Sequence, residues 1–353
     1  MGDLYTRVSV IVDFGIRAEL EELSDSEDEE VVDSAASARV SVENAMKKRL
    51  TESWKVLKRI PNFCEHMCSL AQDRRTRNQV CKLLNAARDA SRSDDTGTLK
   101  KDVISYILLD TKAVITPPIP GVGSKAPRGW SHPQTAALLC PIECDATQVT
   151  YDLILSNELC IDADQFPRFL FPDGHSYEAD DLSTGILTGH LCFRVAKHIF
   201  QGPSTALEHP GHHRGKSGNA ALHGITTMTG CSIAYVACQA RFAISSAESW
   251  NAADFNFDYE KFYWNICRLF DDGEGQDIID AYNYQIWGTS RPSTECSTVH
   301  THTRPSAFEV LQQQRAAKRA RLRNQTSDGR PERDQESQHG RGSQQQSDAP
   351  EDA

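Results

Sequence analysis

Two polar residues, His223 and Arg241, stand out because their neighbours are mostly uncharged and small. A buried arginine needs a partner, since an unpaired charge away from water is costly. We expect Asp94 or Asp95 to pair with Arg241. A buried ion pair that only stabilises the fold is the simpler interpretation; the alternative is a polar pocket that these residues form together with His132.

Cysteine and histidine spacings permit a metal site without requiring one. Cys64 and Cys68 flank His66, and Cys140 and Cys144 are four residues apart. A structural zinc site takes four ligands, usually as two close-set pairs. The first pair, however, lies at helical i, i+4 spacing among apolar neighbours, which favours buried thiols. We therefore predict no metal and no cofactor.

Known catalytic motifs are absent from the sequence. It has no P-loop, no glycine-rich dinucleotide turn, no Gly-x-Ser-x-Gly elbow and no His-Glu-x-x-His. This excludes the commoner nucleotide-binding enzymes, α/β-hydrolases and zincins. An enzyme of unfamiliar type stays open.

A basic cluster over residues 315–323 is typical of a nuclear localisation signal. A solvated basic stretch is the alternative, and salt-sensitive contact with phosphates is a weaker second use. The cations of the cluster are Arg315, Lys318, Arg319, Arg321 and Arg323.

An acidic run near the start of the chain holds two serines, Ser24 and Ser26, each followed by an acid three residues later. Such sites resemble those that casein-kinase-2-type kinases phosphorylate. Like charges at this density stay solvated, so residues 19–38 are expected to form a disordered linker.

Charge and composition restrict the compartment and the partners. The net charge of −11 opposes general binding to nucleic acid, so only weak contact through the basic cluster is expected. The 11 cysteines are odd in number and irregularly spaced, which argues against a secreted disulfide framework. Neither a signal peptide nor a membrane span is visible. We expect a nuclear or nucleocytoplasmic protein with protein partners, no membrane contact and an oligomeric state that the sequence leaves open.

The apolar pattern predicts a mainly α fold: a single irregular multi-helix domain over residues 40–288. A long connection rich in proline and glycine, residues 111–134, interrupts the helices. The stretch 217–249 predicts a short helix, a break near Gly230 and a central second helix. The polar stretch 91–97 predicts the end of one helix before the next begins.

The two ends of the chain differ from this domain. Alternating valines predict a short extended segment over residues 1–18. Residues 289–353 are polar and predicted to be disordered, apart from a thin helical pattern over 306–323.

Several blocks, in a specific order, resemble a large family of basidiomycete fungal proteins that is catalogued as a domain of unknown function. The resemblance covers roughly residues 42–288 and implies a fungal origin and one helical domain, but no activity. The blocks are Arg92–Thr96, Arg128–Pro133, Leu139–Pro141, Gly218–Asn219, His223–Gly224 and Ile233–Ala243.

Two functional hypotheses from different classes follow. The first is a nuclear, non-enzymatic helical interaction module whose charged ends contact partners. The second is an enzyme of unrecognised type in which Asp94, Asp95, His132, His223 and Arg241 converge on a pocket. The enzyme requires these side chains to lie within hydrogen-bond reach of a concave site.

Overall fold

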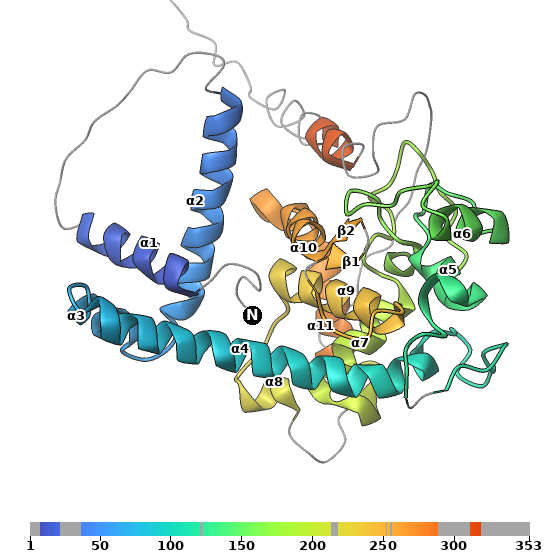
Figure 1. Ribbon diagram of the computed structural model, residues 1–353, viewed down its shortest axis with the longest axis horizontal. Helices are drawn as coiled ribbons and strands as arrows, with labels where there is room; N and C mark the ends of the chain where they lie inside the picture. Colours follow the sequence, from blue (N-terminus) through green and yellow to red (C-terminus); the bar gives the residue numbers. More distant parts are fainter. Residues whose placement is uncertain are drawn as a thin grey trace, which may run out of the picture. The chain divides into compact units, whose positions relative to one another are not determined.

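The computed structural model describes residues 8–21, 37–120, 123–212, 218–251, 253–254, 256–288 and 311–318. These residues are mainly helical, as predicted (Figure 1). The α helices bounded in chain order are α1 (Val8–Glu21), α2 (Ser37–Leu57), α3 (Phe63–Ser69), α4 (Arg74–Asp102), α5 (Pro133–Leu139), α6 (Gln148–Leu155), α7 (His190–Gln201), α8 (Asn219–Leu222), α9 (Gly230–Ile244), α10 (Tyr259–Cys267) and α11 (Gln276–Trp287). Short 3-10 turns are η1 (Val103–Tyr106), η2 (Gly129–Ser131), η3 (Arg168–Leu170), η4 (Pro203–Thr205) and η5 (Arg268–Gly273), and the strands are β1 (Ala253–Asp254) and β2 (Phe257–Asp258).

The first helix, α1, shows that the extended segment predicted over residues 1–18 is wrong from Val8 onward, where the described residues begin. Apolar residues of α1 are buried at helical steps of three and four, whereas Val10, which belongs to the alternating set, is 42 % exposed. The alternating valines predict a strand, which has a period of two. The buried residues instead follow the period of a helix. The buried residues of α1 are Val8, Ile11, Val12 and Ile16.

Helix α1 packs with α2, α3 and the first part of α4 around a small apolar cluster of their own. Trp54 of α2 is buried in this cluster, and its Nε1 donates to Glu19 Oε1 at 2.9 Å. Gly15 lets the two helices approach, because a Cβ there would lie 2.1 Å from the indole ring of Trp54. The linker predicted over 19–38 is thus shortened at both ends, since α1 runs to Glu21 and α2 begins at Ser37.

Helix α4 continues without a break through the polar stretch 91–97, where the sequence predicts the end of a helix. Hydroxyl groups there bond back to carbonyls of the preceding turn: Thr96 Oγ1 donates to Arg92 O at 2.7 Å, and Thr98 Oγ1 donates to Asp94 O at 3.1 Å. Such back-bonding accommodates Ser and Thr inside a helix. Thr98 therefore lies inside α4, so no new helix begins after residue 97.

Helix α9 is the buried centre of the larger apolar cluster, as predicted. Every residue from Ser232 to Ile244 is buried, and α9 contacts α4, α5, α7 and α10 (Figure 1). A capping box starts the helix: Ser232 N donates to Thr229 Oγ1, and Thr229 N donates to Ser232 Oγ. A helix that is buried all round needs small residues where its neighbours come close, which explains its alanines.

The boundaries of the last helices agree with the sequence signals. Asp258 caps α10 by accepting from Lys261 N at 3.0 Å, and Gly288 ends α11 in the left-handed conformation.

The loop rich in proline and glycine is anchored at the C-terminal end of α9. Lys125 is fully buried, and its Nζ donates to the carbonyls of Phe242 and Ala247. Arg128 donates from Nη1 to Ala243 O at 2.8 Å and from Nη2 to the α4 carbonyl of Lys100 at 2.6 Å. Both cations thus satisfy carbonyls where the helix dipole is negative.

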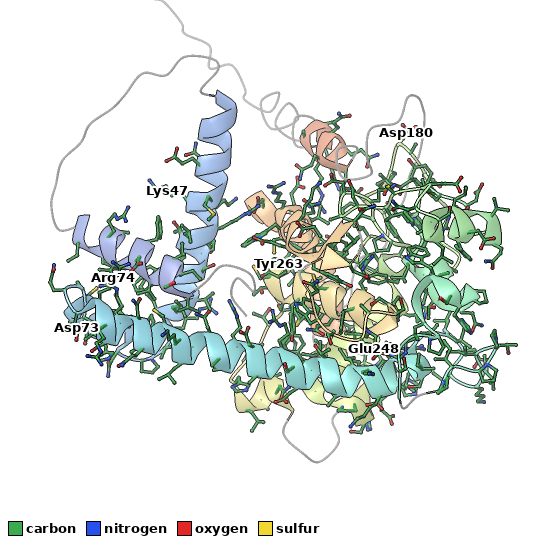
Figure 2. The ribbon with its side chains drawn as sticks, in the orientation of Figure 1. Lys47, Asp73, Arg74, Asp180, Glu248 and Tyr263 are labelled. Carbon is green, nitrogen blue, oxygen red and sulfur yellow. The ribbon has the colours of Figure 1, made fainter. Side chains whose placement is uncertain are left out.

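Glu248 ties the same loop to α4 at the surface. It accepts from Lys100 Nζ at 2.8 Å and from the Lys125 backbone N at 2.5 Å (Figure 2). The loop is irregular in backbone but fixed by hydrogen bonds to two helices and to Glu248.

Residues 311–318 form a helix inside the tail that was predicted to be disordered. The main compact unit of the chain ends at Gln314. Leu311 is fully buried, and Gln314 bonds to the backbone at two points: its Nε2 donates to Ala179 O at 3.1 Å and its Oε1 accepts from Leu182 N at 2.9 Å. The helix lies within the thin helical pattern that the sequence predicts over 306–323, and one apolar side chain and one amide find partners on the domain.

Candidate functional site

Arg241 lies in the last part of α9 with only 4 % of the residue exposed. Its Nη1 donates to Asp254 Oδ2 at 3.1 Å and to the Tyr259 hydroxyl at 2.8 Å. The guanidinium also lies over the Phe257 ring, with Cζ 3.4 Å from the centroid. An acid, a hydroxyl and an aromatic face therefore compensate the buried charge together.

The three partners of Arg241 come from one short stretch of chain. Asp254 closes β1, Phe257 opens β2, and Tyr259 begins α10 directly after the capping residue Asp258. Burial raises the pKa of Tyr259 to about 12, so its hydroxyl stays neutral and accepts from the guanidinium. A hairpin of this length brings all three groups to the same side chain.

A cavity of about 300 Å³ opens beside this cluster. Its polar lining comprises Arg241, Asp254 and two amides, Asn157 and Asn256, which are joined by a hydrogen bond of 3.2 Å. The volume lies at the lower end of the range for ligand sites and accommodates one large side chain or a small ligand. The apolar lining is Trp130, Ile154, Leu155, Leu159, Ile161 and Phe257.

Helix α6 borders the cavity and exposes large apolar side chains. Val149 is 69 % exposed, Leu153 is 37 % exposed, and Leu155, which also lines the cavity, is 53 % exposed. Val149 and Leu153 lie one helical turn apart on the same face. Single exposed apolar residues are ordinary, but three on an eight-residue helix next to a cavity mark a surface that a partner can cover.

The surroundings of α6 are acidic. Between Arg128 and Arg168 the sequence has six carboxylates and neither lysine nor arginine. Asp152 and Glu158 are exposed, whereas Asp164 forms a 2.5 Å ion pair with Lys261. The carboxylates of this stretch are Glu143, Asp145, Asp152, Glu158, Asp162 and Asp164.

The predicted pairing of Arg241 with Asp94 or Asp95 is wrong. Asp94 is exposed on α4, and Asp95 accepts a 2.6 Å hydrogen bond from the Tyr235 hydroxyl instead. Burial raises the pKa of Asp95 to about 6. This contact joins α4 to α9. The Asp95 side chain neither lines the cavity nor bonds to Arg241.

The two histidines proposed for a pocket have separate roles. His223 is exposed at the C-terminal end of α8. His132 is buried and acts as the N-cap of α5: its Nδ1 accepts from Gln134 N at 3.2 Å, and its Nε2 is 2.8 Å from Pro117 O. The five candidates therefore do not converge, and the geometry on which the enzyme hypothesis depended is not present.

A different histidine, His198 of α7, has the buried polar surroundings that sequence reasoning assigned elsewhere. Its Nδ1 shares a 2.9 Å hydrogen bond with the Tyr106 hydroxyl, and its Nε2 shares one of 3.0 Å with Thr98 Oγ1. Burial lowers the pKa of His198 to about 4, against the opposing charge of Asp102. A neutral histidine with both ring nitrogens bonded connects α7, α4 and η1.

Buried cations mostly bond to backbone oxygens. Burial, helped by the charge of Arg128, lowers the pKa of Lys125 to about 7. Arg194 of α7 donates to the carbonyls of Tyr106, Leu108 and Leu109 at 2.5–2.8 Å. Sequence reasoning missed Lys125, Arg128 and Arg194. For Lys125 and Arg128 the available signal was a cation inside the loop rich in proline and glycine, whereas Arg194 lies in α7 and had no such signal.

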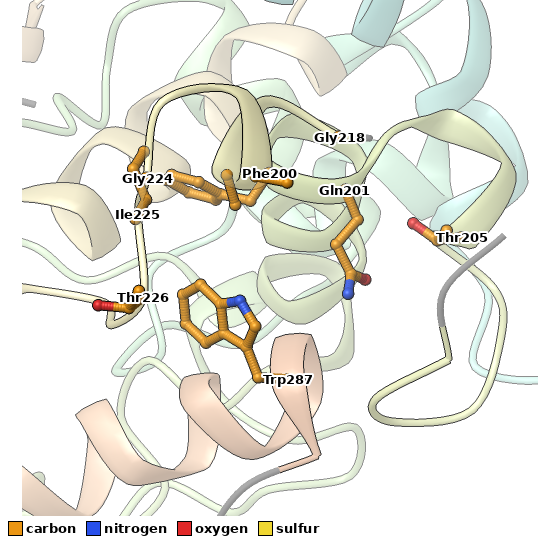
Figure 3. Close-up of a pocket in the computed structure, with 10 residues that line it drawn as sticks. Phe200, Gln201, Thr205, Gly218, Gly224, Ile225, Thr226 and Trp287 are labelled. Atoms are coloured by element: carbon orange, nitrogen blue, oxygen red, sulfur yellow. The ribbon is translucent and has the colours of Figure 1, made fainter. Parts of the chain in front are cut away.

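A second cavity, of about 350 Å³, lies between the ends of α7 and α11 and the segment through α8 (Figure 3). Phe200 and Trp287 point into it, and Gly218 lies so close to Gln201 that a Cβ would be 2.5 Å from its Cα. Its lining is mainly apolar, with Gln201 and two threonines as polar groups. Among the described residues that line it, none is charged.

The predicted metal candidates are held apart from one another. Cys64 and Cys68 belong to α3 in the small apolar cluster, and Cys140 and Cys144 belong to a separate one with Tyr151. Within the described ranges, no three His, Cys, Asp or Glu side chains gather closely enough to hold a metal ion. Among the helices described, none combines the length and apolar character needed to cross a bilayer.

The residues predicted for modification and localisation are described only in part. Arg315 and Lys318 lie in the helix 311–318. Ser24, Ser26, Arg319, Arg321 and Arg323 lie outside the described residues.

These contacts define a mainly helical domain, built around one buried helix, with an open apolar cavity beside a neutralised arginine. The chain belongs to a family of unknown function (DUF6698), whose model matches residues 86–287. The match begins inside α4 and ends with the last residue of α11, so it includes both cavities. No curated protein and no solved structure matches the chain.

Proposed function

We propose that the protein is a helical interaction module that binds other proteins. The observation that supports this most is the surface of α6, where Val149, Leu153 and Leu155 are exposed beside the cavity. Exposed apolar side chains beside a preformed cavity mark a surface that another protein can cover. By contrast, the buried polar side chains considered above are used in packing: Asp95 bonds Tyr235, and Lys125 bonds backbone carbonyls.

The nuclear compartment is part of the same proposal. The basic cluster 315–323 supports it, because dense cations suit the acidic grooves that read localisation signals. Weak, salt-sensitive contact of the cluster with nucleic acid is a second use of these charges. A fungal origin, which the sequence blocks imply, belongs to the proposal as well.

Two experiments test the proposal. Affinity capture of the tagged full-length protein, followed by mass spectrometry of bound proteins and nucleic acid, should retrieve specific protein partners; failure to retrieve any contradicts the module. Deletion of residues 315–323 should abolish nuclear accumulation of the tagged protein. If the distribution of the protein is unchanged, the proposed nuclear localisation loses its support. The interaction module is then judged by the affinity capture alone.

A further inference from the structure

We propose that α6 and the cavity beside Arg241 form a docking site for a cationic segment of a partner protein that inserts one large apolar side chain into the cavity. This inference rests on the proposed function, because it names the chemistry of the partner that such a module binds. We call the site, formed by α6 and the cavity lining, the α6 site.

The apolar part of the site is larger than the cavity alone. Leu155 belongs both to the lining and to the exposed surface, while Val149 and Leu153 do not line the cavity and are exposed on another face of α6, because successive helical residues are about 100° apart. A ligand that filled only the cavity would leave these two side chains in water. A partner segment that inserts one anchor residue beside Leu155 and continues around α6 covers the cavity and these two side chains together.

The charge around the site selects the sign of the partner. Asp152 and Glu158 are exposed at α6 and just after it, and the stretch of chain between Arg128 and Arg168 contributes no lysine or arginine of its own. Arg241, the one lysine or arginine among the described residues of the lining, is already paired with Asp254. A cationic segment therefore gains attraction at the rim, whereas an acidic segment meets like charges.

The cavity itself favours an uncharged anchor. Its lining is mostly aliphatic and aromatic, with Trp130 and Phe257 as the rings. An acidic group that approached Arg241 would compete with Asp254 and Tyr259, which already accept from its Nη1. Leucine, methionine, phenylalanine or tryptophan fits these surroundings better than any ionised side chain.

Fluorescence anisotropy with labelled synthetic peptides tests the site on the full-length protein. The probe is a peptide of about 12 residues that places leucines and one tryptophan on one helical face among lysines. One matched peptide has glutamate at every lysine, and another has serine at every leucine and at the tryptophan. We expect the lysine peptide to bind at least about ten-fold more tightly than either, and to weaken between about 50 mM and about 300 mM salt. Equal binding of the acidic peptide overturns the inference.

Variants locate the binding on the protein. Val149→Ser with Leu155→Ser should weaken the lysine peptide about ten-fold, because both side chains belong to the proposed contact. Leu83→Ser is the matched control. Leu83 is 72 % exposed on α4 and does not belong to the α6 site, so its substitution should leave the affinity for the peptide unchanged. Equal melting temperatures would show that the α6 variant is folded. Unchanged affinity in the α6 variant, or equal loss in the control, overturns the site.

Affinity capture then separates the two proposals. If the wild-type protein and the α6 variant retrieve the same partners, the interaction module stands and the α6 site is wrong. If the wild-type protein retrieves no partner, the proposed function fails, whatever the peptides show. Partners that are lost with the α6 variant and kept with Leu83→Ser support both.

Discussion

Replacing Asp254 by asparagine tests the account of Arg241 most directly. The substitution keeps the shape of the side chain but removes the charge that lies 3.1 Å from Arg241 Nη1. Breaking a buried pair by removing one partner costs about 3–5 kcal/mol, because the other charge stays buried without compensation. Asp254 has a side chain that is 15 % exposed, and the Tyr259 hydroxyl and the Phe257 ring remain in contact with the guanidinium. We therefore expect a loss at or below the lower end of that range, about 2–3 kcal/mol.

Urea unfolding followed by circular dichroism measures this loss as a shift of the midpoint. Asp94→Asn is the matched control, since Asp94 is exposed, and its effect should stay within about 0.5 kcal/mol. In a double-mutant cycle, Arg241→Met together with Asp254→Asn should cost less than the sum of the single changes. Equal effects of Asp94→Asn and Asp254→Asn, or strict additivity in the cycle, would refute the assigned pairing.

Four further predictions concern glycine positions and titration. Gly97→Ala should stabilise the protein by about 0.5–1 kcal/mol, because Gly97 lies inside α4 with nothing within 4 Å of an added Cβ. Gly189→Ala should destabilise the protein by about 1–3 kcal/mol, since the added Cβ would lie 2.1 Å from Phe169 O. Melting temperatures check the two glycine predictions: Gly97→Ala should raise the melting temperature and Gly189→Ala should lower it. Burial raises the pKa of Asp95 from 3.8 to about 6, so the folded state binds more protons and stability should fall as pH rises from about 4 to about 6. Asp95→Asn should abolish that fall, and an unchanged pH profile of the urea midpoint contradicts the assignment. Burial lowers the pKa of Lys125 from 10.5 to about 7, so the unfolded state binds more protons and stability should rise from about pH 7 to about pH 10. The contribution of Lys125 to this rise should be missing in Lys125→Met, and a variant that follows the wild-type profile throughout refutes it.

The sequence is sufficient where apolar spacing and capping residues agree. The start of α10 at Asp258 and the end of α11 at Gly288 follow from local chemistry alone. It is insufficient where two local interpretations compete. The run 91–97 is polar and contains Gly97, yet the hydroxyl of Thr96 bonds back to the helix and α4 continues.

The partner of Arg241 shows a second limit. Sequence reasoning identified the need for an acid but chose among distant candidates, because nothing in spacing alone says how a chain folds back. The true partner, Asp254, is 13 residues further along, carried by a hairpin of two short strands. The aromatic residues Phe257 and Tyr259 beside it were the signal, since rings and an acid close together suit a guanidinium.

The cations that bind backbone carbonyls tolerate substitution much less than the residues whose carbonyls they bind. Lys125, Arg128 and Arg194 must each keep a long basic side chain, whereas their acceptors are main-chain oxygens that any amino acid supplies. Substitution at an acceptor such as Ala243 preserves the bond in principle, but loss of one cation leaves several carbonyls without donors at once. Across relatives, the irregular connections should therefore drift in sequence around a few fixed basic residues, and those residues should give the clearest guide for aligning them.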